Sequence, residues 1–230
     1  MTTASPVVLG DPRISAIALP PTNDDDLVDA REAAPELAWS HLYEEPTGAY
    51  AHLRRDLVER LLRAQDALPE GFRLLLVEGH RPAHIQQEYY DSYAAQLVAE
   101  RGPLPAEELR TLASRYISPP DVAPHVSGAA IDLVLTSAGG EELDMGTRIN
   151  ATPEESEGAC YLAADNIGAE ARAHREVLTA AMGAAGIVNY PPEWWHWSYG
   201  DRYWAFAEGR SQALYGPVRR YFPAKPNPEG

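Results

Sequence analysis

The sequence predicts one folded domain that mixes α-helices with β-strands. The chain of 230 residues is long enough to bury a core, and its hydrophobic fraction of 45% is typical of a folded protein. Leucine and valine recur at helical spacing through 52–68, whereas the short apolar runs at 72–77 and 129–135 have the length of buried strands. Neither a repeat nor a linker divides the chain. We therefore expect a single domain over 1–230, with 1–35 and 218–230 as irregular arms.

The other elements follow from local patterns along the chain. Pro69 and Gly71 end the first helix. The strand at 72–77 then delivers Glu-Gly-His-Arg-Pro at its carboxyl end. Further helices are expected at 83–100, 106–116 and 170–185, and short strands at 187–190 and 194–199. The remaining assignments are a strand-like run at 14–19, a proline-stiffened loop at 117–124, a turn at 137–140 and a long polar loop at 146–168.

Charge and cysteine content exclude several classes of partner. With 19 basic and 34 acidic residues the net charge is −15, which repels nucleic acid and anionic membranes, so we expect neither as a partner. No stretch approaches the roughly 20 apolar residues of a membrane span. The first residues, Met-Thr-Thr-Ala-Ser-Pro, lack the pattern of a signal peptide. The single cysteine, Cys160, cannot form an intrachain disulfide and is expected to be a small buried hydrophobe. These features favour a cytoplasmic protein.

Two segments carry residue types that suit a catalytic metal. His125 lies seven residues before Asp132, and His196 is the only histidine in the later Pro-Glu-Trp-Trp-His-Trp segment. Two imidazoles and one carboxylate are a common ligand set for a Zn²⁺ ion that keeps one position open for water. Asp132 lies within an apolar run, where a carboxylate is costly unless a cation or several donors compensate it. We predict one zinc ion per chain on His125, Asp132 and His196; a hydrogen-bonded structural aspartate and a surface histidine are the alternatives.

Glu193 is the predicted general base. It precedes a cluster of three tryptophans around His196, and such bulky side chains exclude water. Hydrophobic walls would raise the pKa of its carboxyl group toward the range needed to take a proton from water and pass it to a leaving amine. Trp195 is expected to contact the substrate from the same segment. The alternative for Glu193 is a capping or surface glutamate.

Arg81 is the predicted stabiliser of the transition state. Hydrolysis of an amide builds negative charge on the carbonyl oxygen, and a fixed guanidinium can offset that charge without giving up a proton. A solvated turn arginine paired with Glu78 is the alternative.

In combination, these motifs resemble the zinc D-alanyl-D-alanine dipeptidases, the M15 peptidases that include the vancomycin-resistance dipeptidase. The resemblance covers roughly residues 50–200. Its matching positions are Glu78-Gly79-His80-Arg81-Pro82, then His125, Gly128, Ala130 and Asp132, then Met145-Gly146, and finally Glu193-Trp194-Trp195-His196. It implies an α+β fold with a small antiparallel central sheet flanked by helices, as in the hedgehog signalling domain and related bacterial carboxypeptidases. It also implies zinc on His125, Asp132 and His196, with Glu193 as base and Arg81 as the transition-state stabiliser.

Departures from the family pattern concern the amino end of the substrate. Family dipeptidases hold the free ammonium group with an aspartate shortly after Met-Gly, where the nearest match here is the uncharged Asn150. Ala123 and Pro124 stand in place of serines, and His80 in place of a tyrosine. The acidic loop that contains Glu155 offers another partner for an ammonium group, although charged loops are usually just solvated. We therefore assign Asn150 and Glu155 to substrate binding.

Two classes of function fit this sequence. The first is zinc-dependent hydrolysis of a small D-Ala-D-Ala-like dipeptide by metal-activated water, or of a different small amide in a related zinc enzyme. The second is a metal-bearing binding module without turnover, as in the signalling relative. Glu193 and Arg81 favour the enzyme, because a binding surface needs no base beside its metal. A murein carboxypeptidase or endolysin is disfavoured, since we recognise neither an export signal nor a wall-binding module.

Overall fold

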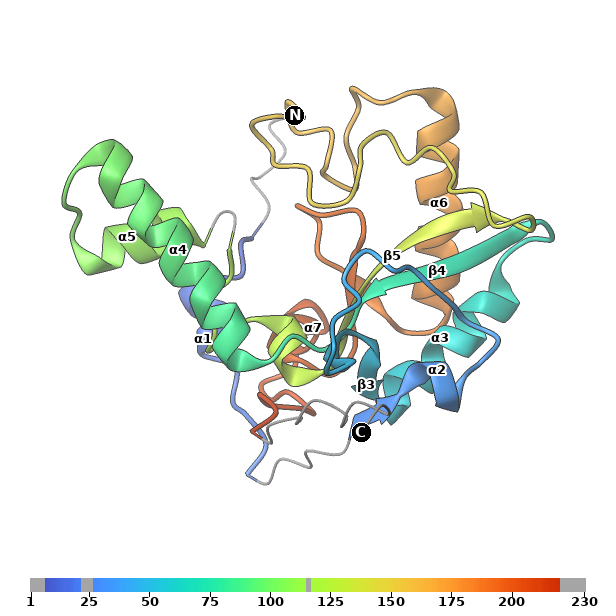
Figure 1. Ribbon diagram of the computed structural model, residues 1–230, viewed down its shortest axis with the longest axis horizontal. Helices are drawn as coiled ribbons and strands as arrows, with labels where there is room; N and C mark the ends of the chain where they lie inside the picture. The colour runs from blue at the N-terminus through green and yellow to red at the C-terminus, as the bar shows by residue number, and fades with distance from the viewer. Residues whose placement is uncertain (1–6, 22–26, 115–116, 220–230) are drawn as a thin grey trace, which may run out of the picture.

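The fold is α+β, as expected, and is built on a small sheet with helices around it (Figure 1). The computed structural model describes residues 7–21, 27–114 and 117–219. Its five-stranded sheet has the order β2-β4-β5-β7-β6. These strands are β2 (Ala38–Trp39), β4 (Phe72–Glu78), β5 (Ala130–Ser137), β7 (His196–Ser198) and β6 (Val188–Asn189). Only β2 runs parallel to its neighbour; the other pairs are antiparallel. A separate antiparallel pair joins β1 (Leu27–Asp29) to β3 (His52–Arg54).

Two long helices cover one face of the sheet. They are α3 (Arg55–Ala67) and α6 (Ala169–Ala184), which pack against each other. The leucine stripe of α3 is buried, with Leu57 and Leu61 fully inaccessible, and it shares one hydrophobic core with Leu178 of α6 and Leu133 of β5. Burial of an amphipathic face provides most of the stability of such helices. The core therefore fixes β4, β5 and β7, which carry the site described below.

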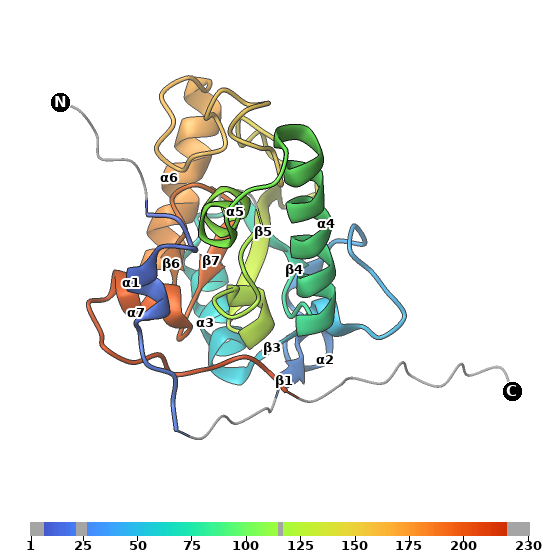
Figure 2. The ribbon, with the colours of Figure 1, turned by 90° about the vertical axis from the view of Figure 1, so that its left-hand side faces the viewer.

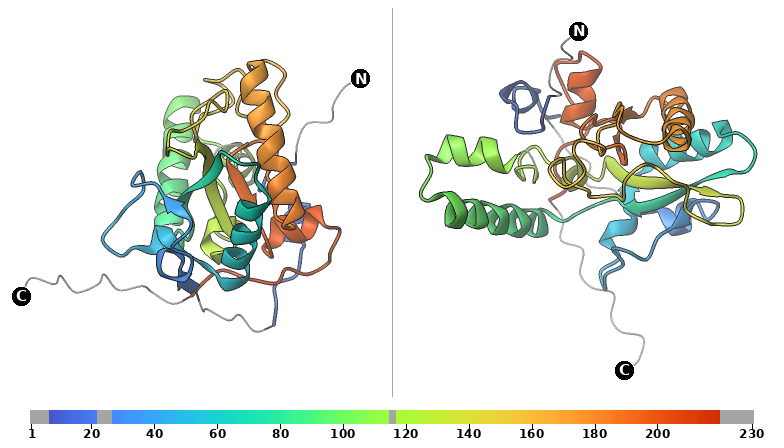
Figure 3. Two further views of the ribbon diagram at one scale, coloured as in Figure 1. Left: turned by 90° about the vertical axis from the view of Figure 1, so that its right-hand side faces the viewer. Right: turned by 90° about the horizontal axis from the view of Figure 1, so that it is seen from above.

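A helical hairpin projects from the body of the molecule. It consists of α4 (Ala83–Arg101) and α5 (Ala106–Ala113), which contact each other (Figure 3). Viewed from the hairpin side, β4, β5 and β7 lie between α4 and α6 (Figure 2). Within α4 only Gln86, Ala94 and Leu97 are buried, so most of this helix faces solvent. The first turn of α4 therefore lies close to the carboxyl end of β4, and the rest extends away.

The remaining elements are short. They are α1 (Pro12–Ser15), α2 (Ala30–Ala33), α7 (Arg202–Ala207), and the 3-10 turns η1 (Ala49–Ala51) and η2 (Pro124–Ser127). The side chains of Asp11 and Asp29 cap the N-termini of α1 and α2. The segment 1–35 is thus less irregular than expected, because α1, β1 and α2 lie within it. Of the arm expected at 218–230, only Val218 and Arg219 belong to the described residues.

Several predicted boundaries differ from the structure. The helix expected from position 52 begins at Arg55, because His52–Arg54 pair with β1 instead. The run at 14–19 is not a strand: Ile14 belongs to α1, and only Ala18 forms an isolated bridge, to Gln212. The strands expected at 187–190 and 194–199 shorten to β6 and β7. In the described part of the chain, no helix combines the length and apolarity needed to cross a membrane.

Candidate metal centre and active site

Three strands bring three polar side chains into one row. Asp132 of β5 is paired with Glu78 of β4 on one side and with His196 of β7 on the other. Residues directly opposite each other in a sheet place their side chains on the same face. All three lie in the interior: Glu78 is 6% exposed, Asp132 3% and His196 2%. The sheet register therefore creates a buried polar row at one face of an otherwise apolar core.

His125 joins this row from the turn η2. Its Nδ1 lies 2.7 Å from the carbonyl oxygen of Gly79, so the Nδ1 hydrogen is donated there and the lone pair of Nε2 faces the row. Nε2 of His125 lies 3.3 Å from Oδ1 of Asp132 and 3.1 Å from Nδ1 of His196. Oδ1 of Asp132 in turn lies 2.9 Å from Nδ1 of His196. Three donor atoms thus converge on one point.

The spacing of these donor atoms fits a divalent metal ion. A tetrahedral zinc with bonds of about 2.0–2.1 Å to nitrogen and oxygen holds its ligand atoms roughly 3.3 Å apart. Ligand atoms of His125, Asp132 and His196 lie close to that separation, and all three residues are buried. Burial alone would raise the pKa of Asp132, but positive charge beside it, which protonated imidazoles of His125 and His196 carry when no metal is bound, outweighs burial and lowers that pKa well below its usual range. The carboxylate is therefore charged and ready to bind a cation.

Glu193 lies beside this cluster, in the turn that precedes β7. The backbone nitrogen of Glu193 donates to the carbonyl of Tyr190 at 2.9 Å, and the side chain of Asn189 donates to the backbone carbonyl of Glu193 at 3.0 Å. These bonds hold the turn so that Oε2 of Glu193 lies 4.0 Å from Nδ1 of His196. Burial raises the pKa of Glu193 to about 7. A carboxyl group with that pKa can take up and release a proton near neutral pH.

Arg81 follows β4 and is held firmly by Glu78. Its Nε and one terminal nitrogen donate to the two carboxylate oxygens of Glu78 at 2.7 and 2.5 Å, and the other terminal nitrogen donates to Gln86 at 2.8 Å. Burial disfavours the charged guanidinium, but the carboxylates of Glu78 and Asp132 outweigh this and raise the pKa of Arg81. The pairing with Glu78 that was the alternative for Arg81 is thus present, while the side chain still lines the same cleft as the histidines.

One cleft of about 300 Å³ contains the cluster, Glu193 and Arg81. Of the residues assigned to substrate binding, Asn150 and Trp195 line this cleft. The Nδ2 of Asn150 donates to the hydroxyl of Tyr43, which also lines the cleft. The ring of Trp195 belongs to the hydrophobic core behind it. The cleft therefore combines charged groups at its centre with neutral polar and aromatic walls.

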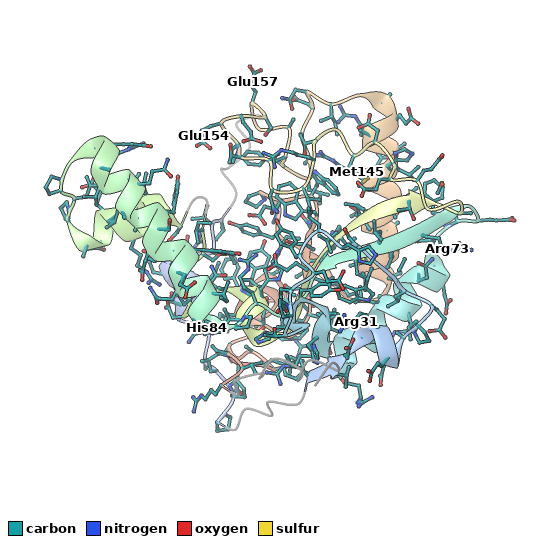
Figure 4. The ribbon with its side chains drawn as sticks, in the orientation of Figure 1. Arg31, Arg73, His84, Met145, Glu154 and Glu157 are labelled. Atoms are coloured by element: carbon teal, nitrogen blue, oxygen red, sulfur yellow. The ribbon has the colours of Figure 1, made fainter. Side chains whose placement is uncertain are left out.

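Glu155 does not reach the cleft. Its carboxylate pairs with the exposed guanidinium of Arg148, and its side chain is 45% exposed. Glu154 and Glu157, on the same loop, point outward from the top of the molecule (Figure 4). The acidic loop is a solvated surface, so the assignment of Glu155 to substrate binding is not supported.

Several residues that line the cleft were not predicted from the sequence, among them three with large polar side chains. Tyr43, Gln86 and Tyr89 line the cleft, and none of them belongs to a motif. Gln86 has a detectable sequence signal, since it lies in the first turn of a helix that follows the Arg81 segment. In the folded chain Gln86 is 1% exposed. Tyr43 has none, because it meets Asn150 across 107 residues of sequence. Long-range contacts of this kind come only from the folded chain.

Known proteins share this sequence pattern. The family Peptidase M15, described as D-ala-D-ala dipeptidase, matches residues 28–211. A D-alanyl-D-alanine dipeptidase of Synechocystis sp. (strain ATCC 27184 / PCC 6803 / Kazusa) is 28% identical in an alignment 179 positions long, which covers 67% of this chain and 71% of that protein.

Two solved structures are also similar. The LdcB LD-carboxypeptidase has 19% identity and a TM-score of 0.46, covering 86% of this chain and 79% of its own. The vancomycin-resistance D,D-pentapeptidase VanY, solved in complex with Zn(II), has 17% identity and a TM-score of 0.36, covering 86% of this chain and 91% of its own. The family match spans most of the sequence, including every predicted metal ligand and Glu193. The chain therefore belongs to the Peptidase M15 family of D-Ala-D-Ala dipeptidases and is a hydrolase.

Proposed function

We propose that this protein is a zinc metallopeptidase that hydrolyses a small D-Ala-D-Ala-like dipeptide. The observation that carries the proposal is the convergence of His125, Asp132 and His196 within 3.3 Å of one another, with the Glu193 carboxylate beside them. One zinc ion per chain fits this donor set. The family to which the chain belongs is described by the same substrate, and the cleft has room for a small peptide.

Each group of residues in the cleft has a separate role in the proposed hydrolysis. Zinc bound here supplies a Lewis acid that polarises the amide carbonyl and lowers the pKa of water. Glu193 removes a proton from the attacking water, whose oxygen bonds to the carbonyl carbon, and returns that proton to the nitrogen as the carbon–nitrogen bond breaks. Arg81, fixed by Glu78, offsets the negative charge that develops on the carbonyl oxygen. The products are two amino acids.

Cys160 bears on where the enzyme works. Cys160 is buried and is the sole cysteine of the sequence, so the chain has no intrachain disulfide that would need an oxidising environment. We accordingly assign the activity to the cytoplasm, a location that cell fractionation with an antibody to the protein would test.

An assay of purified protein tests the main proposal. D-Ala-D-Ala and a panel of other small dipeptides are incubated with zinc-loaded protein, and free amino acids are quantified. We expect release of D-alanine that disappears on chelation and returns on adding zinc. Absence of turnover on every amide, with zinc bound, would instead indicate a binding module.

A related enzyme with a different amide substrate is the second candidate, and the contact between Asn150 and Tyr43 favours it. Both residues line the cleft, and burial raises the pKa of Tyr43 to about 12, so this pair is neutral at physiological pH. A neutral amide and hydroxyl complement the N–H and C=O of an acylated nitrogen better than an ammonium group. The same two residues also border an adjoining groove of about 380 Å³, which offers room for an acyl extension. Faster cleavage of N-acetyl-D-Ala-D-Ala than of the free dipeptide would establish this candidate.

A further inference from the structure

Several buried polar atoms have no hydrogen-bond partner among the described residues, and two of them concern a predicted metal ligand and the residue that caps helix α7. These two atoms are Nε2 of His196 and Oδ2 of Asp201, and each residue is only 2% exposed. Buried polar side-chain atoms are nearly always partnered, so each such atom in a folded protein calls for a physical explanation. The two residues are connected through Ser198, which lies two residues after His196 and donates a hydrogen bond to Asp201, so one explanation can account for both.

Asp201 is held in a fixed orientation with one oxygen to spare. Its Oδ1 accepts hydrogen bonds from the backbone nitrogen of Trp204 at 2.6 Å and from the hydroxyl of Ser198 at 3.2 Å. The first bond caps helix α7, and the second ties the carboxylate to strand β7. Ser198 lies two residues after His196, so both side chains project from the same face of β7. Asp201 is therefore hydrogen-bonded to Ser198, the next side chain after His196 on the same face of β7.

A turn at Gly200 allows the chain to reverse after β7, so that Asp201 can reach Ser198. Gly200 has φ of 92°, and a Cβ atom there would lie 2.6 Å from the ring of Tyr215. Only glycine suits both demands. In addition, burial raises the pKa of Asp201 to about 6, while the charges of His196 and His125 act in the opposite direction.

The two histidines differ in one respect. His125 turns Nε2 toward the donor cluster, and its other nitrogen donates to the carbonyl oxygen of Gly79. His196 turns Nδ1 toward the cluster, so its Nε2 must carry the proton when Nδ1 binds a metal. Metal-binding histidines almost always donate this second N–H to a carboxylate, a carbonyl or water, which fixes the tautomer and the ring orientation. In the described structure His125 has such a partner and His196 does not.

We propose that Asp201 is the positioning residue for His196, accepting the Nε2 hydrogen through one bridging water. A polar contact beyond direct hydrogen-bond distance is commonly completed in this way. The role rests on the metal site of the proposed function. It adds to that function by assigning Asp201 the orientation and basicity of one ligand, in addition to its role as a helix cap.

The variant Asp201→Asn separates the two roles of Asp201. Its remaining carbonyl oxygen can still accept from Trp204 and Ser198, so the cap is kept, while an NH₂ group that cannot accept replaces the second oxygen. We expect a folded protein that binds zinc about 10- to 100-fold more weakly than the wild type, as loss of such outer partners typically causes. Zinc affinity is measured by competition with a chromogenic chelator, and the Co²⁺-substituted protein should show an altered visible spectrum.

Two further variants keep this test decisive. Asp29→Asn changes the cap of α2, where the carboxylate accepts from the backbone of Arg31, and should leave zinc affinity unchanged. Ser198→Ala removes only the hydroxyl that steadies Asp201 and should weaken zinc binding by a few-fold, which covers the case in which Asp201→Asn does not fold.

The outcomes distinguish this inference from the proposed function. Zinc binding within twofold of wild type in both Asp201→Asn and Ser198→Ala overturns the positioning role and leaves Asp201 as a cap alone. If Asp201→Asn fails to fold, unchanged affinity in Ser198→Ala overturns it. A wild-type protein that binds no zinc at all overturns the metal site itself, and this inference with it.

Discussion

Asp132 and His196 lie directly opposite each other on two antiparallel strands, with Oδ1 of the aspartate 2.9 Å from Nδ1 of the histidine. Glu78, which holds Arg81, is the partner of Asp132 on the third strand. A slip of one residue in strand pairing would move these side chains to opposite faces of the sheet. The hydrophobic register of the core therefore also sets the geometry of the proposed catalytic groups.

Glu193→Gln should abolish hydrolysis while leaving metal binding intact. The amide keeps the shape of the side chain but cannot accept a proton from water, so kcat should fall by about 10²–10⁴-fold. Zinc content by elemental analysis should equal that of the wild type, because Glu193 is not among the clustered donor atoms. Turnover close to the wild-type rate would remove Glu193 as the general base.

Arg81→Ala should lower kcat by a factor on the order of 10²–10³, as loss of one contact to a developing oxyanion typically does. Steady-state kinetics on the best dipeptide would measure this. Glu78→Gln is the informative companion, since it keeps the arginine but removes the carboxylate that holds two of its nitrogens, and it should cause a smaller loss. If Arg81→Ala raises only KM, the arginine binds the ground state and does not stabilise the transition state.

His80 should make the fold sensitive to acid. Burial lowers the pKa of His80 to about 4, whereas a histidine in the unfolded chain titrates near its ordinary value of 6.5. Below pH 6.5 the unfolded state binds the proton first, so this contribution to stability is complete above pH 6.5 and is lost as pH falls toward 4. The loss should be on the order of 2–3 kcal/mol at pH 4.

Urea unfolding at several pH values would measure this loss. His80→Gln, which cannot titrate, should flatten the dependence of unfolding free energy on pH between 6.5 and 4. His41→Gln is the matched control, because the side chain of His41 is 88% exposed. Parallel pH profiles for wild type and His80→Gln would contradict the assignment.

Asn150→Asp should shift specificity toward substrates with a free ammonium group. The new carboxylate would line the cleft beside Tyr43, and the ratio of kcat/KM for D-Ala-D-Ala to that for its N-acetyl derivative should rise about tenfold, equivalent to ~1.4 kcal/mol. Glu155→Gln should leave the ratio unchanged, because Glu155 pairs with Arg148 away from the cleft. A ratio that stays constant in Asn150→Asp would place the amino end of the substrate elsewhere.

The sequence was sufficient for elements whose signal is local. Strand β4, helix α4 and helix α6 agree with their predicted ranges to within about one residue, because apolar periodicity and flanking Pro or Gly define them. The start of α3 was misplaced since His52–Arg54 pair with β1, more than 20 residues earlier, and strand pairing outweighs helical pattern there. Tertiary contacts, which local patterns do not contain, decided that boundary.

Some residues of the candidate site can likewise be predicted from the sequence, and others cannot. Residue types, together with the resemblance to the dipeptidase family, predict His125, Asp132, Glu193 and His196, and the folded chain brings these four residues together. Glu155 was assigned from charge alone, and its pairing with Arg148 shows why charge without geometry is a weak guide. Tyr43 and Asp201 have no sequence signal, because their significance arises from contacts formed only after folding.

The metal content of the purified protein is the sharpest test of the ligands assigned to His125, Asp132 and His196. Protein expressed and purified without added chelator is analysed for metal by elemental analysis, beside His125→Ala and His196→Ala. We expect about one zinc per chain in the wild type and markedly less in both variants, with circular dichroism unchanged. Equal zinc in all three proteins, or none in the wild type after incubation with Zn²⁺, would contradict it.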